Sequence, residues 1–361
     1  MRIVIKLGTN LLTTKNSCLD DNRIKDIVRE VASLIKEGHQ VVIVTSGAIC
    51  AGMGKLNLES RPSSLKEKQA LAAVGQPILM DAYKKHFDGQ GLAIAQVLLT
   101  RNDFDQRQNY LNARNTLFTL LEMKVVPIIN ENDTVAVEEI NFGENDTLAA
   151  LVAAKISANV LILLTDVDGL YKGAVGKSEI ISKVDKITDE IESYAKNSSS
   201  SGKGSGGMAS KISAAKIATA NGIKTVIANG LKGHVLARII QGDETGTVFM
   251  PKEALEARKC WIAFGAKCKG KITVDDGAVT AIKENKKSLL PSGIISVEGK
   301  FEVGDTISIL DKSGKEVARG LTFYSSETID KIKKKRSSDI KKILPGADYE
   351  EVIHRDNLVI L

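Results

Sequence analysis

The first 250 residues alternate between short apolar runs and longer segments with helical periodicity. The apolar runs have strand length and cover residues 3–5, 41–44, 93–99, 125–129, 160–164 and 225–228. Apolar residues follow one another directly in these runs, and such a pattern is typical of strands buried on both faces. Six such runs separated by helical segments predict an α/β fold with a mostly parallel sheet sandwiched by helices.

Two helical segments are the clearest. Apolar residues recur at the spacing of one helix face at Ile24, Ile27, Val28, Val31, Leu34 and Ile35. Gly38 follows this segment as a C-terminal signal. A second helix is predicted over residues 208–220, and it ends at Asn221-Gly222.

The pattern changes after about residue 250. Short strand candidates are separated by turn signals at residues 275–277, 291–293, 298–299, 304–305 and 313–314. Turns at this spacing predict a small β-rich barrel or sandwich. We therefore predict two domains, residues 1–257 and residues 258–361.

A polar segment follows each of four predicted strands, and a fifth directly precedes and begins the helix predicted at residue 208. Most of these segments contain glycine. Because the carboxyl ends of parallel strands meet at one edge of a sheet, these segments are expected to form one site. Lys6 ends the first strand, and Lys211 lies in a first helical turn behind the glycine-rich residues 204–207. An ammonium group beside backbone amides suits phosphate. For Lys6, a lysine that reaches solvent at a strand end is the alternative.

The other segments supply hydroxyl, amide and carboxylate groups. Ser46 and Gly47 stand where the second strand turns into a helix, and the N-terminus of that helix would suit an anion. The alternative is that Ser46 only caps the helix. Residues 130–133, with Asn145 and Asp146, suit an ammonium group and carboxyl oxygens, although an Asx-rich turn uses the same residue types. Two lysines, two anion sites and carboxylates at one sheet edge indicate phosphoryl transfer.

Composition and charge exclude several classes of protein. The chain has 361 residues, 43% hydrophobic and 26% charged, which is ordinary for a globular protein. It lacks the roughly 18-residue apolar run of a membrane helix, and its first residues suggest a strand and not a signal peptide. Its four cysteines show no metal-binding spacing, so a cytoplasmic protein without a protein-bound metal is expected.

One segment accounts for the net charge of +6. Residues 331–342 contain seven lysines or arginines against Asp339 alone, so the remaining chain is close to neutral. A basic segment of this kind favours a solvated helix, and RNA binding is the alternative.

The ordered segments resemble the amino acid kinase family. The matching stretches are KLGTN (6–10), VTSGAI (44–49), LAAVGQ (71–76), LLTRNDF (98–104), YLNARNTL (110–117), VPIINENDTVA (126–136), NDTLAALVA (145–153), LLTDVDGLY (163–171) and GSGGMASK (204–211). The C-terminal stretches GKITVDDGAVTAI and SLLPSGI resemble a PUA domain. The resemblance covers nearly the whole chain.

Within this family the chain is most similar to members that use ATP to phosphorylate the γ-carboxylate of L-glutamate, the first step of proline biosynthesis. The resemblance implies ATP and Mg²⁺ as cofactors and proline as a feedback inhibitor. We also expect a homo-oligomer and no membrane association. A γ-carboxylate has a reference pKa near 4.3, so it is ionised at neutral pH and needs no general base. The alternatives are another amino acid or carbamate kinase of the same fold, and an RNA-binding protein acting through the PUA domain.

The resemblance also implies residue roles. Lys6, Lys211 and Asp146 match catalytic positions, and Asp146 is expected close to both the lysines and the substrate. Substrate-binding positions are Ser46, Gly47, Asp133 and Asn145. Nucleotide-binding positions are Lys6, Thr165, Asp166, Ser205, Gly206, Gly207, Met208, Ala209, Ser210 and Lys211. Asn10, Glu144 and Ser205 depart from the residues common in the family, and none of these departures removes a charged catalytic group.

Overall fold

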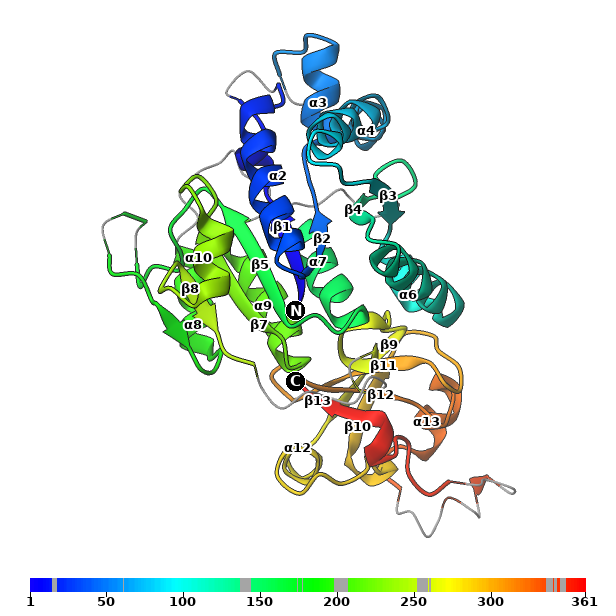
Figure 1. The fold of residues 1–361 in the computed structure, drawn as a ribbon. Coiled ribbons are helices and arrows are strands. Elements are labelled where there is room, and N and C mark those ends of the chain that lie inside the picture. Colours follow the sequence, from blue (N-terminus) through cyan, green and yellow to red (C-terminus); the bar gives the residue numbers. More distant parts are fainter. Residues whose placement is uncertain are drawn as a thin grey trace. The chain divides into compact units, whose positions relative to one another are not determined.

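The computed structural model describes residues 1–14, 18–60, 62–136, 144–173, 175–176, 178–197, 207–251, 259, 261–335, 340, 343–344 and 349–361. The chain divides into two compact units, Met1–Ala254 and Leu255–Leu361 (Figure 1). The boundary predicted at 257/258 falls outside the described residues, so its exact position stays a prediction. No helix in the described ranges combines the length and the apolar character that crossing a membrane requires.

The first unit contains an eight-stranded sheet in the order β3-β4-β2-β1-β5-β7-β8-β6. Its strands are β1 (Arg2–Leu7), β2 (Gln40–Val44), β3 (Ile94–Leu99), β4 (Val126–Glu131), β5 (Val160–Thr165), β6 (Lys183–Val184), β7 (Lys224–Asn229) and β8 (Thr247–Phe249). Neighbouring strands are parallel except β7 and β8. All six predicted strands are confirmed, and the short β6 and β8 were not predicted.

Helices surround this sheet. They are α1 (Thr9–Leu12), α2 (Asp21–Lys36), α3 (Ala48–Lys55), α4 (Leu65–Asp88), α5 (Asn102–Asp105), α6 (Arg107–Glu122), α7 (Glu144–Lys155), α8 (Asp189–Asn197), α9 (Met208–Ala220) and α10 (Val235–Gln241). The two predicted helices are confirmed as α2 and α9. Asp20 caps α2 by accepting a hydrogen bond from the Arg23 backbone N–H at 3.0 Å, and Gly38 beyond its end has a φ of 87°.

The central strand β1 divides its side chains between the two faces of the sheet. Ile3, Ile5 and Leu7 are fully buried in a cluster with residues of α2, α4 and α10. Because side chains alternate along a strand, Lys6 points to the opposite face, where α7 packs against β1. Since β1 lies between β2 and β5, the chain switches sides of the sheet here, which places a binding crevice at these carboxyl ends.

Helices α3 and α4 approach each other closely through two glycines. A Cβ atom at Gly75 would lie 1.8 Å from the Ala48 carbonyl oxygen, and one at Gly52 would lie 2.1 Å from that of Leu71. No larger residue fits at either position without moving a backbone. This contact places the middle of α4 against the first residue of α3.

The second unit contains a five-stranded sheet in the order β10-β9-β11-β12-β13. The strands are β9 (Gly270–Val274), β10 (Ile294–Glu298), β11 (Thr306–Leu310), β12 (Glu316–Leu321) and β13 (Leu358–Ile360), with helices α12 (Asp276–Lys283) and α13 (Ser326–Ile332). It also contains the short π-helix η1 (Trp261–Gly265) and the 3₁₀ helices η2 (Pro291–Gly293) and η3 (Arg355–Asn357). The predicted turns at 304–305 and 313–314 lie between strands, and the one at 298–299 begins at the last residue of β10. The turn predicted at 291–293 is the short 3₁₀ helix η2.

Two expectations for this unit need correction. The turn predicted at 275–277 is the start of α12, because the Asp275 side chain accepts a hydrogen bond from the Ala278 backbone N–H at 2.7 Å and caps the helix. A basic helix over residues 331–342 is wrong at residues 333–335, which follow the end of α13 at Ile332. Residues 336–339 and 341–342 lie outside the described residues.

Lys155, at the end of α7, is an unusual member of the core. Its side chain is 1% exposed, and its Nζ has no hydrogen-bond partner among the residues described. The Nζ lies 4.0 Å from the ring centre of Phe104 and 4.5 Å from that of Tyr110. Burial lowers the pKa of Lys155 to about 8 despite the opposing charge of Asp103.

We expect Lys155→Met to stabilise the protein. At pH 7 the buried ammonium group of Lys155 destabilises the folded state. The free energy of unfolding of the variant should therefore exceed that of the wild type by about 2 kcal/mol. Because the amine deprotonates first in the folded state, wild-type stability rises between pH 8 and about 10.5, and the difference between the two proteins shrinks. Urea unfolding at pH 7 and 10 measures this, with the exposed Lys25→Met as control. A less stable variant would mean that the aromatic contacts outweigh burial.

Candidate active site

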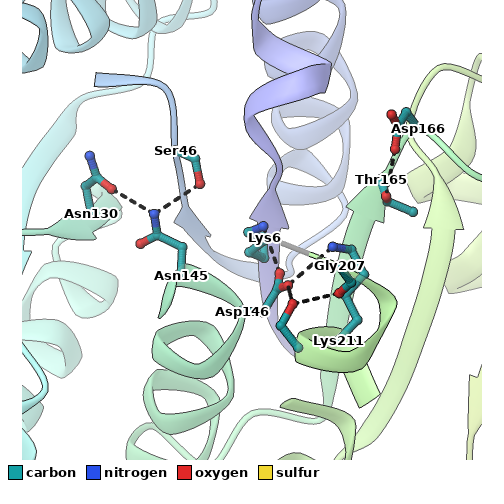
Figure 2. Close-up of polar contacts among 10 residues, drawn as sticks. Lys6, Ser46, Asn130, Asn145, Asp146, Thr165, Asp166, Gly207 and Lys211 are labelled. Atoms are coloured by element: carbon teal, nitrogen blue, oxygen red, sulfur yellow. Dashed lines mark hydrogen bonds and ion pairs between the residues drawn. The ribbon is translucent and has the colours of Figure 1, made fainter. Parts of the chain in front are cut away.

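Three charged side chains meet at the carboxyl end of β1. The Lys6 Nζ lies 2.7 Å from Asp146 Oδ1, and the Lys211 Nζ lies 3.3 Å from Asp146 Oδ2 (Figure 2). Lys6 comes from β1, Asp146 from the first turn of α7 and Lys211 from the first turn of α9. The structure therefore brings together the three residues predicted as catalytic, from distant parts of the sequence.

This cluster is almost dry. Asp146 is fully buried, and Lys6 and Lys211 are each 4% exposed. Burial alone would raise the pKa of Asp146, but the charges of Lys6 and Lys211 outweigh it and lower that pKa to about 2. Burial lowers the pKa of Lys6, and the nearby Asp146 opposes that shift. With both lysines protonated, the cluster carries one net positive charge in a nearly water-free position.

Ser210 links this cluster to the start of α9. Its Oγ lies 2.6 Å from Asp146 Oδ2 and 2.8 Å from the Gly207 carbonyl oxygen. A hydroxyl has one proton, so Ser210 donates to one of these two acceptors at a time. Gly207 caps α9 without a side-chain hydrogen bond, and the N-terminus of a helix is a position that suits an anion.

An amide cluster lies on the β2 side of β1. The Asn145 Nδ2 donates to Ser46 Oγ at 3.0 Å and to Asn130 Oδ1 at 3.3 Å (Figure 2). Gly47, next to Ser46, has a φ of 106° and caps α3, a backbone conformation that favours glycine. The sequence-predicted residues Ser46 and Asn145 are thus in direct contact.

Asp133 follows β4 and is half-buried. Among the described residues, no hydrogen-bonding or charged partner affects its pKa. Burial raises its pKa to about 6. A partly buried carboxylate without such a partner is stabilised when a cation or a hydrogen-bond donor binds to it.

Thr165 ends β5, on the other side of β1, and Asp166 follows it. The Thr165 Oγ1 donates to Asp166 Oδ1 at 3.1 Å, and Asn10 Nδ2 donates to Asp166 Oδ2 at 3.0 Å. Asp166 is exposed, so it remains accessible to a ligand. Asn10, one of the departures noted in the sequence, therefore contacts a predicted nucleotide-binding residue.

The glycine-rich segment before α9 is partly described. Ser205 and Gly206 lie outside the described residues, so their predicted roles stay predictions. Gly207 and Ala209 are exposed, whereas Met208 is buried at 8% exposure and packs inward.

Sequence reasoning missed Gln76 as a member of this site. Its side chain in α4 accepts a hydrogen bond from Asn130 Nδ2 at 2.8 Å. The available signal was a polar residue beside Gly75 in the stretch LAAVGQ. That signal is weak, because a glutamine on a helix is usually solvent-facing.

The arrangement has the groups that transfer of an anionic group requires. Ammonium groups and helix N–H donors lie at the centre, and carboxylate and amide acceptors lie on the β2–β4 side. The positive groups can neutralise a transferring phosphoryl group, and the acceptors can hold an ammonium group.

Comparisons with known proteins show the family to which the chain belongs. The model of the amino acid kinase family matches residues 1–229, and that of the PUA domain matches residues 270–344. A relative from Thermoanaerobacter pseudethanolicus, called glutamate 5-kinase, is 50% identical over 365 residues, which cover 100% of this chain and 98% of the relative. Relatives of the same name from Moorella thermoacetica and Geobacter sulfurreducens are 49% and 47% identical, and these matches cover 100% of this chain and 96% and 97% of theirs.

We expect Asp146→Asn to destabilise the fold strongly. The change leaves two buried ammonium groups without their carboxylate, so the free energy of unfolding should fall by about 3 kcal/mol at pH 7. Because the folded pKa of Asp146 lies below its unfolded value, the stability from its ionisation is present above pH 4 and lost as the pH falls through 2. The difference between the two proteins should therefore shrink toward pH 2.

Urea unfolding across this pH range measures the effect. Asp88→Asn is the control, because Asp88 also pairs with a lysine but lies on the surface. Equal losses in both variants would contradict a special role for the buried cluster.

Proposed function

Since the chain belongs to the amino acid kinase family, we propose that it uses ATP to phosphorylate the γ-carboxylate of L-glutamate. The observation that carries the proposal is the buried Lys6–Asp146–Lys211 cluster at the carboxyl edge of the sheet. The relatives named glutamate 5-kinase support this choice of acceptor over other carboxylates. The product would be the acyl phosphate, L-glutamyl 5-phosphate, which opens the route to proline.

The two lysines would act on the transferring group. Repulsion between a carboxylate and a polyanion is the main obstacle to this reaction, and Lys6 and Lys211 bring positive charge where it is needed. Asp146 would hold both ammonium groups in place. The γ-carboxylate oxygen attacks the γ-phosphorus, the new O–P bond forms, the bond to the β-phosphate oxygen breaks, and ADP leaves with that electron pair.

Glutamate would lie on the β2–β4 side of the cluster. Ser46 and the backbone at Gly47 would bind a carboxylate, and Asn145 and Asp133 would bind the α-ammonium group. The carboxylate of Asp133 has no hydrogen bond or ion pair with another described residue, and this supports the role because an ammonium group would satisfy its charge.

ATP would lie on the β5–α9 side. Thr165 and Asp166 would bind the nucleoside, and the segment from Ser205 to Lys211 would bind the phosphates at the α9 N-terminus. Among the residues described, no group of three or more His, Cys, Asp or Glu side chains is suited to hold a metal ion. Because Mg²⁺ is usually bound through substrate phosphates and few protein carboxylates, we propose that it enters with ATP, as the Mg–ATP complex.

Inhibition by proline and a homo-oligomeric assembly stay predictions that rest on the resemblance to this family. RNA binding by the PUA domain also stays a prediction, and the basic segment that suggested it is only partly described.

Trapping with hydroxylamine tests the reaction directly. The purified chain, ATP and Mg²⁺ are incubated with a panel of amino acids and dicarboxylates, and hydroxamates are measured. L-Glutamate should give the highest kcat/KM in the panel. A higher value for another carboxylate would overturn the proposed acceptor.

Lys6→Ala and Lys211→Ala should each lower kcat by roughly 10²–10³-fold, with smaller effects on the KM values. Each lysine would stabilise charge that develops mainly in the transition state. The control is Lys216→Ala on the same helix α9, where the lysine is exposed and pairs with Glu192. A raised KM with normal kcat would contradict the assignment.

Asp133→Asn should raise the KM for glutamate and leave the KM for ATP nearly unchanged. The wild-type KM for glutamate should also rise as the pH falls through about 6, because protonation removes the charge that binds the ammonium group. The variant should lack this pH dependence. Steady-state kinetics between pH 5 and 8 measures both, and parallel changes in the two KM values would indicate general damage to the site.

A further inference from the structure

A chain of hydrogen-bonded amides connects the edge of the sheet to the candidate glutamate site. Gln76 Nε2 donates to Gln96 Oε1 at 3.4 Å, and Asn130 Nδ2 donates to Gln76 Oε1 at 2.8 Å. Asn145 Nδ2 then donates to Asn130 Oδ1 at 3.3 Å. The chain runs from the edge strand β3 through α4 and β4 to the first turn of α7.

One backbone group sets the direction of the whole chain. The Glu131 N–H donates to Asn130 Oδ1 at 2.9 Å, and a backbone N–H can only donate. The side-chain oxygen of Asn130 is therefore fixed on that side, and its NH₂ group must face Gln76. Asn130 is 2% exposed, so water does not offer an alternative partner for its NH₂ group.

Gln76 completes this arrangement from α4. It supplies the only oxygen that accepts from the Asn130 NH₂ group among the described residues. The close approach of α4 to α3 at Gly75, the preceding residue, brings Gln76 to this position. Without that acceptor, the buried NH₂ group would lose its hydrogen-bond partner, and rotation of the Asn130 amide would become more favourable.

The fixed amide of Asn130 in turn fixes the orientation of the Asn145 amide. Its NH₂ group is held by Asn130 Oδ1 and Ser46 Oγ, so its oxygen must point away from both (Figure 2). That Oδ1 is buried and has no hydrogen-bond partner among the described residues. A buried acceptor without a partner is costly, and a ligand that donates a hydrogen bond removes the cost.

We propose that Gln76 is a positioning residue for substrate selection. By fixing the amide of Asn130, it makes Asn145 present its oxygen, and not its NH₂ group, to the substrate. The site then selects a γ-carboxylate substrate that bears an α-ammonium group over one that lacks it. This inference rests on the proposed glutamate kinase function.

Three variants test the proposal. Gln76→Leu keeps the size of the side chain and removes the acceptor. Gln76→Glu keeps an oxygen for Asn130, and the exposed Gln96 can rotate its own amide to donate to the second oxygen. Gln96→Leu removes only the exposed outer end of the chain, where water replaces the lost partner, and it serves as the control.

The readout compares glutamate with glutarate, which has both carboxylates and no amine. In Gln76→Leu the KM for glutamate should rise roughly tenfold, while the KM for ATP and the kcat/KM for glutarate stay near wild type. Gln76→Glu and Gln96→Leu should both keep wild-type selectivity. A structural defect would instead raise both KM values and lower the kcat/KM for glutarate. That result would overturn the proposal, as would unchanged selectivity in Gln76→Leu.

A second measurement is independent of the substrate. The side-chain NH₂ resonances of Asn145, assigned by comparison with Asn145→Asp, should shift in Gln76→Leu and not in Gln96→Leu. If the wild-type chain makes no acyl phosphate from glutamate, the proposed function fails. If these resonances do not move, the relay through Gln76 fails, whatever the substrate is.

Discussion

The site depends on one carboxylate that holds two ammonium groups in a nearly dry position. Removing three charged groups from water is unfavourable, and the cluster persists because Asp146 contacts both lysines at once. With both lysines protonated, these three side chains together carry one net positive charge. The site is thus electrostatically biased toward an anion such as a phosphoryl group.

The neighbouring polar groups are uncharged amides, and they also hold one another in place. Asn130, Asn145 and Gln76 form a sequence of amides in which each donor meets an acceptor. The donors and acceptors of such a network all follow one orientation, and the Glu131 backbone N–H fixes it. The glycine contact between α3 and α4 contributes by holding a glutamine next to strand β4. Packing between helices therefore affects which atom the site presents to a ligand.

Much of this could be predicted from the sequence. The central strands were found because runs of valine, isoleucine and leucine have few alternatives to a buried sheet, whereas β6 and β8 have two and three residues and too little pattern. Asp275 was misread because aspartate is as common at helix N-caps as in turns. Lys6, Asp146 and Lys211 were predicted as site residues, but their mutual contacts depend on how α7 and α9 pack. Gln76 was missed because its role comes from a tertiary partner and not from a local motif.

The order of the cluster along the chain has a consequence for biosynthesis. Lys6 is among the first residues to leave the ribosome, Asp146 follows much later, and Lys211 emerges last, close to the end of the first unit. Until α9 has been made, the carboxylate can neutralise only one ammonium group, and β7 is missing from its place beside β5. The nascent chain thus has no complete anion site while the sheet is being assembled. Premature capture of nucleotide by a partly folded chain is disfavoured by the position of one lysine in the sequence.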